Sequence, residues 1–277
     1  MPELPEVEVI RRQLAPSLLG RIVAQVRTSS AAQPFLTRPA VLKKQLAGRR
    51  VVSLERAGKY LLIVFDQDQR LLIHLGMTGR LFLSRVPGSA GRKSKPDPHT
   101  HLRLSFQDGG PEVCLRDPRK FGKVLLLGPG KTCPRLQRLG KDALDASGRE
   151  LFLATRKRKI AIKSLLLDQS IIAGIGNIYA DEALFISGIS PARKAGRLTQ
   201  EECALVIQSA KRVLARAIRA GGSSISDYLH PDGSAGRYQN QHRVYGRTGQ
   251  PCVNCRTAIL RAVIGQRSSH YCPRCQT

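Results

Sequence analysis

The sequence predicts an α+β protein in which strands come first, helices follow and a cysteine-rich segment ends the chain. Residues 22–127 carry short apolar alternations separated by turn signals, a pattern typical of a sandwich or barrel. Residues after 158 carry apolar side chains at spacings of three and four, which is typical of helices. The last segment holds four of the seven cysteines. The 277 residues suffice for two modest domains.

The N-terminal half opens with a helix over 5–19, predicted from one apolar stripe of Val7, Ile10, Leu14 and Leu18. Short strands follow, each bounded by polar or glycine-rich turns; they are expected over 60–65, 70–75, 102–106, 113–116 and 123–127. Residues 85–98 are rich in Gly, Pro and Lys, and we expect a mobile surface loop there.

Three helices are expected in the second half, over 158–167, 177–186 and 199–219. Thr199 and Glu202 form a capping-box pattern at the start of the last one, and Gly221 is placed to end it. Three arginines, Arg212, Arg216 and Arg219, share one face of this helix. They form either a solvated face or a phosphate contact.

Charge sets the expected partner. Lys and Arg total 46 against 20 Asp and Glu, a formal net charge of +26. Such an excess attracts polyanions, and nucleic acid is the leading one. An anionic membrane is the rival, but the chain has no 18-residue apolar run. The acidic, proline-punctuated start is no secretory signal, so we expect a cytoplasmic protein.

The C-terminal cysteines have zinc-ligand spacing. Cys252 and Cys255 form one C-x2-C pair, and Cys272 and Cys275 form another after sixteen residues. Two such pairs place four thiolates around one tetrahedral Zn²⁺ with no open position, so the metal is expected to be structural. Strands over 257–264 and 268–271 would form the hairpin between them. The other three cysteines, Cys114, Cys133 and Cys203, are expected to be buried thiols.

Three loops could contact nucleic acid. Gly174 and Gly176 precede Asn177 at a helix start, where amides can hold a phosphate or simply form a helix–helix turn. The basic run at 156–159 favours the phosphate. The loops at 74–79 and 117–122 combine glycine with Met, Arg or Phe. Their large side chains either wedge into a base stack or belong to the core.

Several motifs, taken in chain order, resemble the bacterial formamidopyrimidine-DNA glycosylases. They are MPELPEVE at 1–8, RAGKYL around Lys59, HLGMTG at 74–79, DPRKFG at 117–122, GIGNIYADE at 174–182, AGGSS at 220–224, VYGR at 244–247 and the paired cysteines. The resemblance covers the whole chain. It implies an N-terminal helix and β-sandwich over 1–130, a linker over 131–148, a helix–two-turn–helix domain over 149–235 and a zinc finger over 236–277.

The resemblance implies a bifunctional enzyme acting on damaged double-stranded DNA. It would flip out an oxidised purine such as 8-oxoguanine or a formamidopyrimidine, cut its glycosidic bond and cleave the backbone by β,δ-elimination. The nucleophile would be the amine of Pro2 after removal of Met1, since N-terminal amines titrate near pH 8. Glu3 would be the general acid or proton relay. Lys59 would serve β-elimination. Arg267 would serve δ-elimination by stabilising a phosphate leaving group, because guanidinium does not readily give up a proton.

The other implied residues contact DNA. Phosphates would be held by His74, Asn177 and Tyr245. The gap left by the flipped base would be filled by Met77, Arg119 and Phe121. Further DNA contacts would come from His99 and Arg158. His101 is the alternative to His99. Glu6 faces the flipped base or caps its helix, and residues 221–223 would form a mobile lid. We expect a monomer, with no membrane partner, on the bacterial nucleoid.

Two rivals remain at the level of the sequence. One is a same-fold glycosylase of the endonuclease VIII type, which acts on oxidised pyrimidines; the set Met77, Arg119 and Phe121 and the ELPEVE start favour purines. The other is a non-enzymatic DNA-binding protein with a zinc ribbon. It explains the charge and the cysteines, but it does not explain a proline at the mature terminus.

Overall fold

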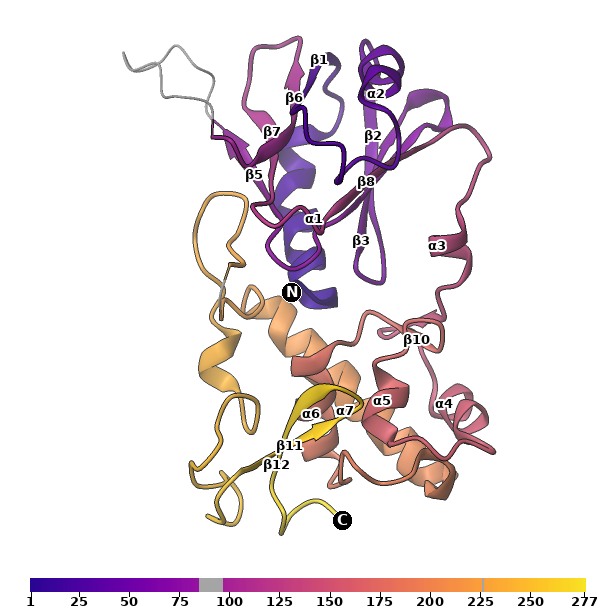
Figure 1. Ribbon diagram of the computed structural model, residues 1–277, viewed down its shortest axis with the longest axis vertical. Coiled ribbons are helices and arrows are strands. Elements are labelled where there is room, and N and C mark those ends of the chain that lie inside the picture. The colour runs from indigo at the N-terminus through magenta and orange to yellow at the C-terminus, as the bar shows by residue number, and fades with distance from the viewer. Residues whose placement is uncertain (85–96, 226) are drawn as a thin grey trace. The chain divides into compact units, whose positions relative to one another are not determined.

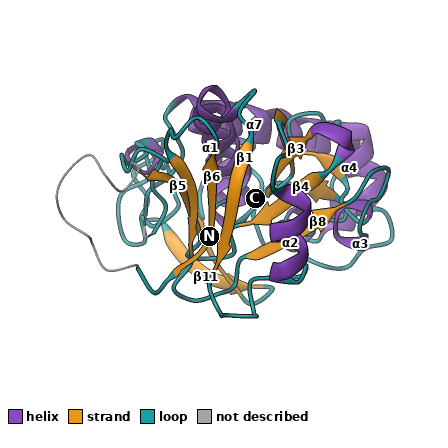
Figure 2. Ribbon diagram, turned by 90° about the horizontal axis from the view of Figure 1, so that it is seen from above, coloured by secondary structure: helices purple, strands orange, loops and turns teal. Residues whose placement is uncertain are grey.

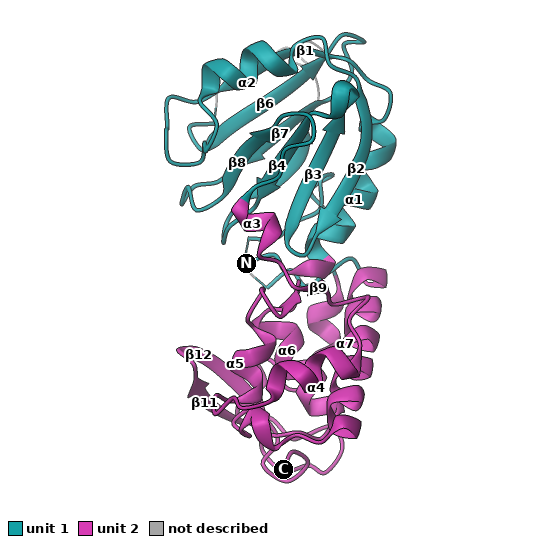
Figure 3. Cartoon of the chain, turned by 90° about the vertical axis from the view of Figure 1, so that its right-hand side faces the viewer, with its two compact units in different colours: residues 1–2, 6–133, 221–236 teal, residues 3–5, 134–220, 237–277 magenta. Residues whose placement is uncertain are grey.

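The computed structural model describes residues 1–84, 97–225 and 227–277 (Figure 1). The chain forms two compact units, coloured separately in Figure 3. Unit 1 comprises Met1–Pro2, Glu6–Cys133 and Gly221–Gly236, and unit 2 comprises Glu3–Pro5, Pro134–Ala220 and Arg237–Thr277. The loop expected over 85–98 lies outside the described residues, apart from its last two positions.

Unit 1 is a β-sandwich of two four-stranded antiparallel sheets, ordered β1-β6-β7-β5 and β2-β3-β4-β8. Figure 2 shows these strands in orange. Their bounds are β1 Val23–Thr28, β2 Val51–Ala57, β3 Tyr60–Phe65, β4 Arg70–His74, β5 Arg80–Ser84, β6 Thr100–Phe106, β7 Glu112–Arg116 and β8 Lys123–Leu127, with a 3-10 turn η1 at Asp66–Asp68. The structure therefore resolves the choice between sandwich and barrel.

The sandwich core also takes in two helices. Helix α1 (Leu4–Leu18) buries the predicted stripe, including Ile10 and Leu14, among strand residues such as Leu61 and Leu115. Helix α2 (Pro39–Leu46) was not predicted, because eight residues are too few to display a clear helical period. Its buried Leu42 and Leu46 lie one turn apart.

Unit 2 is mainly helical. Its elements are α3 Pro134–Gln137, α4 Gly148–Thr155, α5 Ile162–Leu166, α6 Asn177–Ile186 and α7 Gln200–Arg219, the 3-10 turns η2 Ala195–Arg197 and η3 Tyr238–Gln241, and the short parallel strands β9 Lys141–Asp142 and β10 Ile172–Ala173. The capping box of Thr199 and Glu202 is confirmed at α7. The helix expected over 158–167 begins only at Ile162, because Ala161 before it is extended and forms an isolated antiparallel bridge with Lys194.

The C-terminal hairpin consists of β11 (Leu260–Ile264) and β12 (Arg267–Tyr271), close to the predicted strands. Gly265 and Gln266 both have positive φ and make the tight turn. Its small core contains Phe185, Val244 and Ile259 together with two of the cysteines. No helix among the described residues is both long and apolar enough to cross a membrane.

Residues 221–236 group with the sandwich and not with the helices that precede them. The Tyr228 ring is part of the sandwich core, and the backbone N–H of Leu83 in β5 donates to the carbonyl oxygen of Pro231 at 3.1 Å. The segment thus returns to unit 1 after α7 ends. The domain implied over 149–235 would instead have kept most of this segment with the helices that precede it.

Candidate nucleic-acid and catalytic site

The four cysteine sulfurs converge at the base of the hairpin. All four Sγ atoms lie within 4.8 Å of one another; Cys252 and Cys275 are 3.9 Å apart and Cys255 and Cys272 are 3.5 Å apart. Tetrahedral zinc with Zn–S bonds of about 2.3 Å places its sulfurs roughly 3.8 Å from each other. The residues therefore fit one structural Zn²⁺ that leaves no position for a substrate.

Strand β12 is fastened to the helices of unit 2 by a buried ion pair. The Lys163 Nζ lies 2.7 Å from an Asp181 carboxylate oxygen, and both side chains are fully buried. Lys163 also donates to the carbonyl oxygen of Ser268 at 2.6 Å, and Asp181 accepts from the backbone N–H of His270 at 2.9 Å. Burial lowers the pKa of Lys163, and the Asp181 carboxylate opposes that shift. The pair thus holds β12 at Ser268 and His270, two positions apart in the strand.

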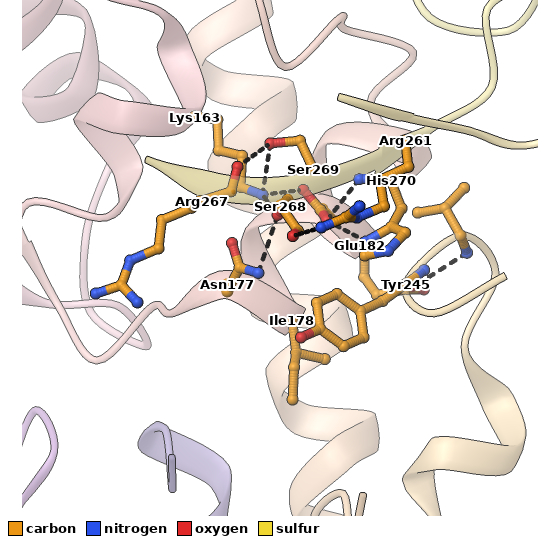
Figure 4. A network of polar contacts seen from close by, with 12 residues as sticks. Lys163, Asn177, Ile178, Glu182, Tyr245, Arg261, Arg267, Ser268, Ser269 and His270 are labelled. Carbon is orange, nitrogen blue, oxygen red and sulfur yellow. Dashed lines mark hydrogen bonds and ion pairs between the residues drawn. The ribbon is translucent and has the colours of Figure 1, made fainter. Parts of the chain in front are cut away.

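Asn177 and Arg267 both lie next to Ser268, the residue whose carbonyl oxygen Lys163 binds (Figure 4). The Asn177 amide donates to the Ser268 carbonyl oxygen at 3.0 Å, so this side chain is oriented by β12. Arg267 is exposed and extends away from the polar cluster, at the start of the strand that Lys163 holds. An exposed guanidinium on a fixed backbone is well suited to contact a phosphate.

The start of helix α6 is occupied by the Glu3 carboxylate. The backbone N–H of Ile178 donates to Glu3 Oε1 at 3.0 Å, and Glu3 is only 3% exposed. A Cβ on Gly176 would lie 2.2 Å from the Glu3 carboxyl carbon, so glycine is needed for this approach. We expected a phosphate at these amides. The Ile178 amide instead binds a carboxylate from the chain's own N-terminus, which the helix dipole stabilises.

In unit 1, the buried Asp117 joins the loops at 74–79 and 117–122. One carboxylate oxygen accepts from the Thr78 hydroxyl at 2.5 Å, and the other accepts from the Gly122 N–H at 2.7 Å. The loops touch so closely that a Cβ on Gly76 would lie 2.6 Å from the Gly122 nitrogen. Asp117 therefore fixes the relative position of the two loops.

These joined loops carry two exposed apolar side chains. Met77 is 42% exposed and Phe121 is 50% exposed, and the Arg119 guanidinium lies over the Phe121 ring at 4.8 Å. The alternative of core residues is therefore wrong for both Met77 and Phe121. Exposed apolar side chains on loops that are fixed to each other, with a cation beside them, can enter a stack of DNA bases.

Lys59 lies on the turn between β2 and β3 and is buried at 7% exposure. The Arg56 guanidinium donates to the carbonyl oxygen of Gly58 at 3.1 Å and also to Glu8 at 3.2 Å. Glu8 further accepts from Arg11 and Arg12. Burial raises the pKa of Glu8, but the hydrogen bonds from Arg11 and Arg12 outweigh it and lower the pKa to about 2. This acid thereby ties α1 to the Lys59 turn.

Glu6 contacts the segment expected to form a lid. Its Oε1 accepts from the Ser223 N–H at 2.8 Å, and a Cβ on Gly222 would lie 2.9 Å from the same oxygen. Gly222 has φ +80°, a conformation that favours glycine. In this structure the Glu6 carboxylate therefore binds the backbone of the segment.

The remaining predicted residues differ in their surroundings. His101 is buried, with its ring nitrogens 2.8 Å from the Ser29 hydroxyl and 2.9 Å from the Asp117 carbonyl oxygen, whereas His99 is partly exposed. This favours His99 over His101 as a DNA contact. Pro2 is buried, His74 accepts from the Gly76 N–H through Nδ1, and Arg158 is exposed beyond α4.

Three family models match the chain. They are the formamidopyrimidine-DNA glycosylase N-terminal domain over residues 1–124, its H2TH domain over 139–228 and a zinc finger found in FPG and IleRS over 249–277. A formamidopyrimidine-DNA glycosylase of Solibacter usitatus is 43% identical over 100% of this chain and 99% of its own length. One of Neisseria meningitidis is 42% identical over the full length of both.

The chain belongs to the formamidopyrimidine-DNA glycosylase family. Solved structures of the family agree. A Lactococcus lactis FPG mutant in complex with Fapy-dG DNA has a TM-score of 0.89 at 34% identity, covering 100% of both chains. MutM (FPG) from Thermus thermophilus has a TM-score of 0.85 at 38% identity, covering 99% of this chain and 98% of its own. The family resemblance, the α+β fold and the zinc finger predicted from sequence are thereby confirmed.

Four charged residues that contact the backbone or side chains around the predicted site residues were missed by sequence reasoning: Asp117, Lys163, Asp181 and Glu182. All four are fully buried. Three of them interrupt apolar stretches, IAIKSLLL and NIYADEALF. A charge in such a stretch needs a polar partner once it is buried, so the pattern contained a usable signal.

Proposed function

We propose that this enzyme excises oxidised purines from duplex DNA and then cleaves the strand, with the Pro2 amine as nucleophile. The observation that carries the proposal is the placement of Glu3. Directly after Pro2 in the chain, this carboxylate is buried and held on the α6 N-terminus. An acid fixed beside a secondary amine is suited to proton transfer during attack on a sugar.

The chemistry follows from an N-terminal proline. Once Met1 is removed, Pro2 carries a secondary amine, and chain-terminal amines have pKa values of about 8, against about 10.4 for lysine. Attack of this nitrogen on C1′ displaces the damaged base and opens the sugar to an iminium. The iminium acidifies the C2′ proton, and its removal expels the 3′ phosphate. A second elimination releases the 5′ phosphate.

Two basic residues would assist the eliminations. Lys59, on the turn held by Arg56, would contact a phosphate and donate a proton in β-elimination. Arg267 would stabilise the phosphate leaving group in δ-elimination, because guanidinium remains protonated. The zinc takes no part in these steps; Cys252, Cys255, Cys272 and Cys275 fix the hairpin that carries Arg267.

The DNA contacts would come from residues placed by rigid supports. Met77, Arg119 and Phe121 would fill the space left by the flipped base, which lowers the cost of flipping by roughly a few kcal/mol. Backbone phosphates would be bound by His74, Asn177 and Tyr245, and further DNA contacts would come from His99 and Arg158. We further propose that the enzyme acts as a monomer on the nucleoid of the bacterial cytoplasm.

Borohydride trapping tests this proposal. Protein confirmed to lack Met1 is incubated with an 8-oxoguanine duplex and borohydride, which reduces the iminium to a stable adduct. We expect a covalent adduct and faster excision of 8-oxoguanine than of thymine glycol. Absence of an adduct would refute covalent catalysis. A preference for thymine glycol would favour the endonuclease VIII type of specificity.

A further inference from the structure

Glu182 of helix α6 has an unusual set of partners. Its Oε1 accepts from three successive backbone N–H groups, those of Arg243 at 3.0 Å, Val244 at 2.9 Å and Tyr245 at 2.9 Å. Its Oε2 also lies 3.0 Å from the Arg243 nitrogen. The side chain is fully buried. One carboxylate therefore gathers the amides of a whole turn.

Burying a carboxylate costs free energy, so the hydrogen bonds that Glu182 accepts must offset its desolvation. Burial raises the pKa of Glu182, and the backbone hydrogen bonds from Tyr245, Val244 and Arg243 oppose that shift. Three parallel N–H dipoles form a concave site that favours an anion. Hydrogen bonds to a carboxylate are roughly twice as strong as neutral ones. The turn at 243–245 is therefore fixed to α6 more firmly than packing alone would fix it.

The turn at 243–245 directs the Val244 side chain into the zinc-finger core and the Tyr245 side chain toward His270. Val244 is fully buried in the small core of the zinc finger. The Tyr245 ring packs edge-on against the His270 ring, with centroids 4.9 Å apart, and its phenol lies near the Asn177 side chain at the start of α6 (Figure 4). Asn177 in turn donates to Ser268, which follows Arg267.

We propose that Glu182 is the positioning residue for Tyr245. By holding the backbone amides of 243–245 it places the Tyr245 phenol beside Asn177, so that both side chains meet one DNA phosphate together. This inference rests on the proposed function, in which Tyr245 and Asn177 bind phosphate. It adds that the affinity of this contact depends on a buried acid that never meets DNA.

The direction in which Glu182→Gln changes DNA affinity distinguishes a positioning role from a long-range charge effect. Glu182→Gln removes a negative charge from a DNA-binding unit, and a long-range charge effect would tighten DNA binding. Positioning predicts the opposite. The glutamine carbonyl accepts more weakly, and its NH2 group faces the Arg243 N–H if it takes the Oε2 place. The turn loosens and binding weakens.

The test measures the affinity of the zinc-loaded full chain for a duplex with a non-cleavable abasic-site analogue. We expect Glu182→Gln to weaken binding about five- to tenfold. Tyr245→Phe should weaken it by at least as much, and the double variant should add less than about twofold to Tyr245→Phe. Hydrogen exchange of the 243–245 amides should accelerate about tenfold in Glu182→Gln. The control is Glu150→Gln, which removes an exposed acid of α4 while glutamine keeps its cap; binding should stay unchanged or tighten.

Each contrary result is decisive. Wild-type affinity in Glu182→Gln, or effects of the two substitutions that multiply in full, would overturn the inference. So would wild-type affinity in Tyr245→Phe, since the anchored turn would then provide no contact. Borohydride trapping at saturating protein keeps the proposed function separate: Glu182→Gln should reach the wild-type adduct yield, whereas failure of the wild type to trap would refute the function itself.

Discussion

Adding one methyl group at Gly176 tests the placement of Glu3. In Gly176→Ala the new Cβ would lie 2.2 Å from the Glu3 carboxyl carbon and 2.5 Å from Oε1. Gly176 has φ −127°, which alanine adopts without strain, so the only cost is the collision. Because the atoms struck belong to the acid itself, Glu3 must leave the Ile178 amide. The substitution displaces the acid without changing it.

The magnitude follows from what Glu3 loses. A hydrogen bond to a charged group contributes about 1.5–3 kcal/mol, and a carboxylate at a helix N-terminus gains roughly another 0.3–1 kcal/mol. We therefore expect Gly176→Ala to lower the free energy of unfolding by about 2–4 kcal/mol. A positioned acid contributes roughly 10²- to 10⁴-fold to rate, so base excision should fall at least about 100-fold.

Single-turnover excision of 8-oxoguanine and urea denaturation measure the two effects. Gly128→Ala is the matched control, since its Cβ would meet nothing closer than a Lys131 carbon at 3.8 Å. In a Glu3→Ala background the collision partner is gone, and Gly176→Ala should then cost little further stability. Excision at the wild-type rate by Gly176→Ala would refute the assignment of Glu3. An equal loss of stability with and without Glu3 would show that the collision is not the cause.

Three further predictions concern the supports of the site. Chelation of zinc should abolish binding to damaged duplex, measured by fluorescence anisotropy and restored by added Zn²⁺; normal binding by metal-free protein would contradict the role given to the hairpin. Glu8, with its pKa lowered from 4.5 to about 2, should contribute about 2–3 kcal/mol of stability above pH 4.5, and this is lost as the pH falls toward 2. The pH dependence of urea unfolding should therefore flatten over this range in Glu8→Gln, and an unchanged profile would exclude the assignment. Asp117→Asn should loosen the two joined loops and weaken binding to the abasic-site duplex about tenfold. The reason is that the amide NH2 group faces either the Thr78 hydroxyl or the Gly122 N–H, which are both donors. Unaltered affinity would show that DNA binding by these loops does not depend on Asp117.

Much of the fold could be predicted from local patterns. The apolar stripe of α1, the alternation in β6 and the capping box at Thr199 are all properties of neighbouring residues, and each appears where expected. The cysteine pairs are equally local, since their spacing encodes the ligand geometry. Helix α2 was missed because it is short. The late start of α5 was missed because the extended conformation of Ala161 comes with a bridge to Lys194, a residue distant in sequence.

The supports of the site could not be predicted, because their partners are distant in sequence. Glu3 meets Ile178 across 175 positions, and Lys163 meets Ser268 across 105. Rules based on residue spacing cannot identify partners so distant in sequence. The sequence therefore favoured a phosphate at the α6 amides over a plain helix–helix turn. Family resemblance named the residues thought to touch DNA. It gave no role to Asp117 or Glu182, which bind the backbone N–H groups of Gly122 and Tyr245.

Mapping the trapped adduct tests the central claim most directly. Protein lacking Met1 is trapped on an 8-oxoguanine duplex with borohydride, digested and analysed by mass spectrometry for the modified peptide. We expect one adduct per chain, on the N-terminal peptide and at the nitrogen of Pro2. An adduct on Lys59 or another lysine would contradict it, and so would efficient trapping by protein that retains Met1.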